Sequence, residues 1–151
     1  EMRTSILQQV IENMEIKSKL PEISRISNVN AFEKYLMAFH LSQQDSRKNI
    51  DSAKSLLLNA LKIDPSFGLA YGMLADIQLR MFSSTNDVQL LQSASEYAQR
   101  ALRCSPNISL AYKVLGICAR LQENYNLALS SLSKCVAFAP QDPECFRELA
   151  N

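Results

Sequence analysis

The chain has 151 residues, of which 47% are hydrophobic and 21% charged, with 3 glycines, 5 prolines and no tryptophan. Sixteen basic residues stand against 15 acidic ones, and a formal net charge of +1 with interspersed signs argues against a nucleic-acid or anionic-membrane surface. So few glycines and prolines argue against a turn-rich β fold, and the length suffices for a domain with its own core.

The first part of the chain, residues 1–28, contains one amphipathic segment. Apolar residues recur three and four positions apart over residues 3–19, and Leu20-Pro21 ends the pattern. This stripe consists of Ile6, Leu7, Val10, Ile11 and Met14. We expect a helix that either caps the following helices or is the stem of a domain upstream of Glu1. The sequence contains no apolar run of the roughly 18–20 residues that a membrane helix needs, and no signal peptide pattern opens it.

Helical periodicity, prolines and capping residues divide residues 29–151 into successive helix pairs. We expect helices at about 29–43, 48–63, 66–82, 87–104, 107–121, 124–137 and 142–150. The polar segments 42–47 and 83–87 are rich in N-capping residues, which predicts longer turns within the first two pairs. The predicted fold class is therefore all-α.

A repeat organises these helix pairs. Three of the predicted helices end at a proline in a similar context, and 34 residues separate Pro106 from Pro140 while 41 separate Pro65 from Pro106. The positions that recur at fixed distances are Ala53, Ala94 and Ala128, 12 residues before the prolines; Ala60, Ala101 and Cys135, 5 before; and Tyr71, Tyr112 and Phe146, 6 after. Small residues at such positions let two helices approach closely.

This pattern resembles the tetratricopeptide repeat, whose 34-residue unit reads W-x2-L-G-x2-Y, then A-x3-F, A and P. Residues 107–140 match it best, at Tyr112, Leu115, Gly116, Ala128, Leu132, Cys135 and Pro140, although Ala119 replaces the usual tyrosine. The resemblance covers about residues 29–151. It implies a right-handed α-solenoid of about three helix-turn-helix repeats and the start of a fourth.

A narrower similarity concerns function. Residues 28–36, residues 53–65 and the pattern Ala70-Tyr71-x-x-Leu-Ala resemble repeats appended to bacterial signalling proteins. These include adenylate cyclases, serine/threonine kinases and HilA-like winged-helix transcription regulators, in which an effector domain precedes the repeats. The similarity implies the C-terminal part of a larger regulator that self-associates or binds a protein partner. The alternative is a free-standing adaptor or assembly chaperone that binds a client peptide.

The sequence contains no recognisable catalytic motif. It lacks a glycine-rich phosphate loop, G-x-S-x-G, H-E-x-x-H and an aspartate-rich calcium loop, and His40 is the only histidine. Gaps of 14, 17 and 10 residues separate Cys104, Cys118, Cys135 and Cys145, without a C-x-x-C pair. We therefore expect no enzymatic activity, metal or cofactor, and mostly packed, free thiols in a reducing compartment, which predicts a cytoplasmic protein.

In tetratricopeptide arrays, the first helices of the pairs line a concave groove that binds peptides or helices. The positions that the resemblance carries over are Glu33, Met37, His40, Gly72, Asp76, Arg80, Lys113, Ile117 and Arg120, with Arg147 at the edge. Met73 is added to this predicted groove as an apolar candidate. Some family members clamp an acidic chaperone tail with basic and amide residues. In their places this sequence has Met37, Gly72, Asp76 and Ile117, so we do not expect such a clamp.

The predicted groove leaves two pairs of alternatives open. Lys113, Arg120 and Arg147 form either a basic patch for an acidic peptide or ordinary solvated charges. Met37, Met73 and Ile117 either receive an apolar helix or fill the core. If the basic patch binds a partner, charge reversal at Lys113 and Arg120 is expected to weaken binding and leave the melting temperature nearly unchanged.

Overall fold

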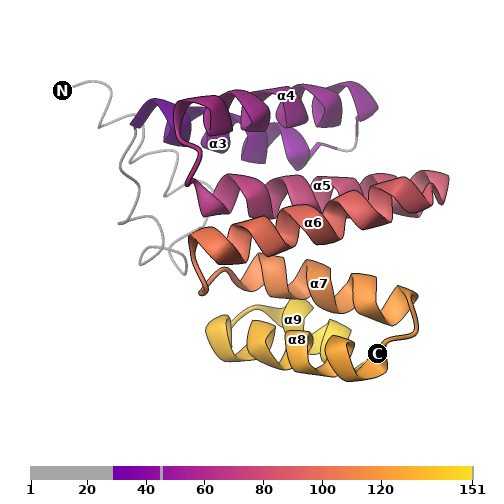
Figure 1. The fold of residues 1–151 in the computed structure, drawn as a ribbon. Helices are drawn as coiled ribbons and strands as arrows, with labels where there is room; N and C mark the ends of the chain where they lie inside the picture. The colour runs from indigo at the N-terminus through magenta and orange to yellow at the C-terminus, as the bar shows by residue number, and fades with distance from the viewer. Residues whose placement is uncertain (1–28, 45, 151) are drawn as a thin grey trace. The chain divides into compact units, whose positions relative to one another are not determined.

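The computed structural model describes residues 29–44 and 46–150, and the chain divides into two compact units with their boundary between Phe67 and Gly68 (Figure 1). All regular secondary structure in these described residues is α-helical, in seven helices. The predicted all-α class is therefore confirmed for them. The helix expected at residues 3–19 and the segment 1–28 lie outside the described residues.

The first unit contains one pair of helices, α3 (Val29–Ser42) and α4 (Arg47–Ile63), which pack on each other. Its core is aromatic: the ring of Tyr35 lies 6.1 Å from that of Phe32 and 5.4 Å from that of Phe67, measured between centroids. On α4 the repeated small residues Ala53 and Ala60 are fully buried. The small side chains thus lie on the face of α4 that contributes to the core.

The second unit contains α5 (Gly68–Thr85), α6 (Val88–Cys104), α7 (Ser109–Leu121), α8 (Tyr125–Phe138) and α9 (Pro143–Ala150). Helix α5 pairs with α6, and α7 pairs with α8 (Figure 1). Helix α7 also contacts both helices of the preceding pair, and α9 in turn contacts both α7 and α8. The same three-helix contact pattern therefore occurs twice.

Glycine and alanine residues allow the close approaches of helices within the second unit. A Cβ atom added to Gly116 on α7 would lie 2.5 Å from Cγ of Leu132 and 3.4 Å from the backbone oxygen of Ala128, both on α8. A Cβ added to Gly68 would lie 2.7 Å from Cδ1 of Ile108 and 3.2 Å from the backbone oxygen of Ala101. Gly116 and Ala128, two small residues of the predicted repeat, thus stand where α7 and α8 pack closely, and Gly68 is a close contact that the repeat did not predict.

The predicted helices occur within a few residues of their expected bounds, and the largest difference is at the end of α5. We expected residues 83–87 to form a turn, but the helix continues through Thr85. The hydroxyls of Ser83, Ser84 and Thr85 donate to backbone oxygens of the preceding turn, which keeps these polar residues compatible with a helix. Asn86, with a φ of 57°, then redirects the chain, and Asp87 caps α6.

Candidate interaction surface

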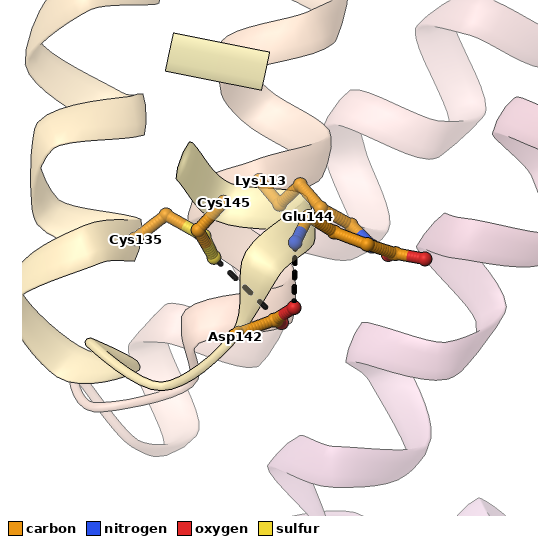
Figure 2. Close-up of a disulfide and its surroundings, with 5 residues drawn as sticks. All are labelled: Lys113, Cys135, Asp142, Glu144 and Cys145. Carbon is orange, nitrogen blue, oxygen red and sulfur yellow. Dashed lines mark hydrogen bonds and ion pairs between the residues drawn. A yellow bond between two sulfur atoms is a disulfide. The ribbon is translucent and has the colours of Figure 1, made fainter. Parts of the chain in front are cut away.

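Ion pairs join the first-helix residues of α7 to α9. The ammonium group of Lys113 donates a hydrogen bond to Oε2 of Glu144, and only 12% of the Lys113 side chain is exposed. This hydrogen bond, with the charge of Lys113, lowers the pKa of the Glu144 carboxyl below its ordinary value. Figure 2 shows the two side chains next to each other, beside the disulfide described below.

A second pair lies further along the same two helices. Nη2 of Arg120 is 2.8 Å from Oε2 of Glu148, and Nη1 donates to the backbone oxygen of Glu148 at 3.3 Å. Arg147 is the most exposed of the predicted basic residues, with 66% of its side chain accessible and Nη2 4.0 Å from Oε1 of Glu148. The predicted basic patch is therefore a network of paired charges. Neither alternative from the sequence included these ion pairs, because the acidic partners, Glu144 and Glu148, lie on the next helix, α9.

The candidate residues of α5 differ in exposure. Asp76 and Arg80 form an ion pair one turn apart, with Nε 3.4 Å from Oδ2. Met73 is only 4% exposed. Gly72 is also buried, and a Cβ atom added to it would lie 3.3 Å from Cγ2 of Ile108. The structure therefore places Met73 in the core and corrects its assignment to a binding face. On α7, Ile117 is half-buried.

The candidates of the first unit lie on the outer surface of α3. Met37 is 57% exposed, and His40 is also exposed. Nε2 of His40 is 3.5 Å from Nε2 of Gln44, whose Oε1 accepts a hydrogen bond from Asn49 at 2.5 Å. Met37 is thus an apolar side chain available for contact, next to a small polar cluster.

The cysteines differ from the sequence prediction. Cys135 on α8 and Cys145 on α9 form a disulfide, with their Cα atoms 5.8 Å apart (Figure 2). The expectation of free thiols is wrong for these two residues, because the short connection between α8 and α9 brings them within disulfide range. Cys118 and Cys104 lie outside this disulfide, and burial raises the pKa of the Cys118 thiol to about 11.

Several exposed apolar side chains on α8 and α9 were not among the sequence candidates. Tyr125 and Leu129 lie one turn apart on α8 and are 65% and 60% exposed. Phe138, 47% exposed, stacks on Tyr112 with 5.6 Å between centroids, and Phe146 on α9 is 48% exposed. The spacing of Tyr125 and Leu129 is visible in the sequence. However, in the sequence it is indistinguishable from a core stripe.

Among the described residues, no group of three or more histidine, cysteine or acidic side chains is placed to hold a metal ion. None of the described helices combines the length and apolarity that crossing a membrane requires. No protein-family model matches the sequence, and a search of curated proteins finds no match either.

Proposed function

We propose that the chain is a tetratricopeptide-type α-solenoid that acts as a non-catalytic protein-interaction module. The observation that carries this proposal is the repeated packing in the second unit, where α7 contacts α5 and α6 in the way that α9 contacts α7 and α8. Each helix pair in such an array covers its apolar side with the first helix of the next pair. The buried small residues Ala94, Gly116 and Ala128 support the same arrangement.

A non-catalytic role agrees with the chemistry of the described polar groups. The Cys118 thiol has a pKa of about 11, so it is protonated at neutral pH and is a poor nucleophile. Glu144 forms an ion pair with Lys113, and Glu148 forms one with Arg120, so both the acidic and the basic groups are paired. What the first-helix faces offer is shape, charge pairs and exposed apolar side chains, which suits recognition of a protein or peptide.

We further propose that the module has a regulatory role. The similarity to repeats of bacterial transcription and signalling regulators suggests a module that transmits a contact to an effector domain encoded with it. The second candidate, an adaptor or assembly chaperone, is favoured by the exposed Tyr125 and Leu129 on α8, which suit an apolar client segment. The upstream coding sequence distinguishes the two, because only the first requires an effector domain on the same polypeptide.

Site-specific photo-crosslinking in cells that make the full-length protein tests the interaction role. A photoreactive amino acid replaces Met37 or Arg147, which are exposed on first helices, or Arg100, which is exposed on the second helix α6. We expect a discrete crosslinked protein, or a discrete crosslink within the full-length protein, from Met37 or Arg147 and none from Arg100. Identical products from all three positions, or none from Met37 and Arg147, would contradict the proposal.

A further inference from the structure

Helix α9 is attached to the rest of the second unit by three specific contacts. The Cys135–Cys145 disulfide joins it to α8, and the pairs Lys113–Glu144 and Arg120–Glu148 join it to α7. Among residues Pro143–Ala150 of this helix, Cys145 is the one fully buried residue. Helix α9 therefore contributes little apolar burial beyond the disulfide itself.

The disulfide is the strongest of these contacts. The Lys113–Glu144 pair contributes little, because 51% of the Glu144 side chain is accessible to solvent. The Arg120–Glu148 pair is less exposed, at 29% and 15%, and holds α9 at one further point. Phe146, 48% exposed, adds only partial burial. Without the covalent link, α9 has few contacts to keep it in place.

What α9 covers is a matched pair of cationic side chains. Lys113 and Arg120 lie two turns apart on α7, and only 12% and 29% of their side chains are exposed. The carboxylates that meet them, Glu144 and Glu148, lie one turn apart on α9. Helix α9 thus has the chemistry of a ligand for this pair: a helix with two carboxylates four residues apart.

We propose that Lys113 and Arg120 form a latent docking site for an acidic helix, which α9 covers while the Cys135–Cys145 disulfide is closed. A dithiol opens it: the bond between the two Sγ atoms accepts two electrons and two protons, giving two protein thiols, and the dithiol becomes a disulfide. Helix α9 then leaves α7 for part of the time, and a helix from a partner with glutamates four residues apart takes its place. This inference rests on the proposed interaction role and names the partner chemistry.

Hydrogen exchange and lysine acylation on the intact chain test the release of α9. Reduction is expected to speed amide exchange in α9 by about tenfold or more and to leave α5, α6 and α7 protected. The same treatment is expected to raise the acylation rate of Lys113 toward that of Lys62, which is exposed on α4. The double variant Cys135→Ser/Cys145→Ser should behave like the reduced protein without any dithiol, whereas Cys104→Ser should still require it.

A fluorescent peptide that copies residues 143–151, with serine for Cys145, tests the docking site. Because α9 competes for the same residues, the oxidised protein is expected to bind it about tenfold or more weakly than the reduced protein. A copy with glutamine at the positions of Glu144 and Glu148 should lose this difference.

The outcomes separate this inference from the proposed function. Unchanged protection of α9 on reduction, or loss of protection throughout the second unit, overturns the redox release. Equal binding of the peptide to both states, or binding to neither, overturns the docking site. The crosslinking at Met37 uses a residue of α3 and not of α9, so it tests the interaction role separately from the release of α9.

Discussion

The guanidinium group of Arg120 on α7 holds Glu148 on α9 at two points, the carboxylate at 2.8 Å and the backbone oxygen at 3.3 Å. Only 15% of the Glu148 side chain is exposed. The ionised Glu148 carboxylate has lost most of its hydration, and the pairing with Arg120 compensates for this loss. The pair therefore positions α9 as well as balancing charge.

The first prediction concerns this pair. Arg120→Ala should lower the free energy of unfolding by about 1–3 kcal/mol, because it leaves the Glu148 carboxylate without its charged partner. Adding Glu148→Gln should recover part of this loss, since an amide needs no counter-charge. Urea unfolding of the wild type, both single variants and the double variant measures the coupling. A coupling near zero would show that the two side chains do not stabilise each other.

The same geometry changes what charge reversal is expected to do. Placing glutamate at Lys113 and Arg120 would oppose Glu144 and Glu148 with like charges, so the melting temperature should fall. The sequence alone predicted an unchanged melting temperature, because it treated the two cations as independent surface groups.

The second prediction uses two glycines as a matched pair. Gly116→Ala should destabilise the protein by about 1–3 kcal/mol, because its new methyl group would meet Leu132 at 2.5 Å. Gly72→Ala should be near neutral or slightly stabilising, since the closest atom, Cγ2 of Ile108, is 3.3 Å away and alanine favours a helix. Chemical denaturation gives both values. Equal effects of the two substitutions would mean that helix propensity, and not close packing, decides them.

Much of the helical framework was predictable from the sequence, because the fold repeats local signals. Prolines after the helices, small residues at fixed distances before them and the 3.6-residue period all report on single helices. Gly116 and Ala128 could be assigned to a close helix contact in this way. The same signals could not show that Ser83, Ser84 and Thr85 extend α5, since their hydroxyls suit a cap as well as a helix.

The candidate surface was harder to predict, because pairing across helices leaves no local signature. Lys113 and Glu144 are 31 positions apart, and the sequence does not show that they meet. The Cys135–Cys145 disulfide could not be predicted for the same reason, since it depends on how α9 packs on α8. Met73 could not be separated from Met37, because both follow an apolar helical pattern and only packing decides which is buried.

The third prediction concerns the beginnings of two helices. Oδ1 of Asp87 accepts a hydrogen bond from the backbone nitrogen of Gln89 at 3.0 Å, whereas the side chain of Ser46 makes no capping hydrogen bond to α4. Asp87→Ala should therefore cost about 1 kcal/mol. Ser46→Ala should cost clearly less. Thermal and urea unfolding of the two variants check the contrast, and it fails if Ser46→Ala is as damaging as Asp87→Ala.

The fourth prediction is a pH dependence. The hydrogen bond from Lys113 and its charge lower the pKa of Glu144 in the folded protein, so folding favours the ionised carboxylate. Its stabilising contribution should be complete above the ordinary carboxyl pKa and be lost as the pH falls through the lowered value. In Lys113→Met this part of the acid-induced loss should be smaller. Urea unfolding between about pH 3 and 7 compares the variant with the wild type, and parallel curves would contradict the assignment.

The fifth prediction concerns the buried thiol. The Cys118 side chain is 1% exposed, its Sγ donates to the backbone oxygen of Leu91 at 3.8 Å, and burial raises its pKa to about 11. At pH 8 the native thiol is almost entirely protonated as well as inaccessible, so iodoacetamide should modify it only when the structure opens. Mass spectrometry should detect alkylation of the exposed Cys104 first.

Cys118 alkylation should then follow the unfolding transition in urea. Above pH 9 the unfolded chain ionises this thiol while the folded chain keeps it protonated, so its ionisation should favour unfolding as the pH rises toward 11. Cys118→Ala removes the titrating group and should flatten that part of the stability curve. Rapid alkylation of native Cys118 at pH 8, at the rate of Cys104, would show that the contact between α6 and α7 opens on its own.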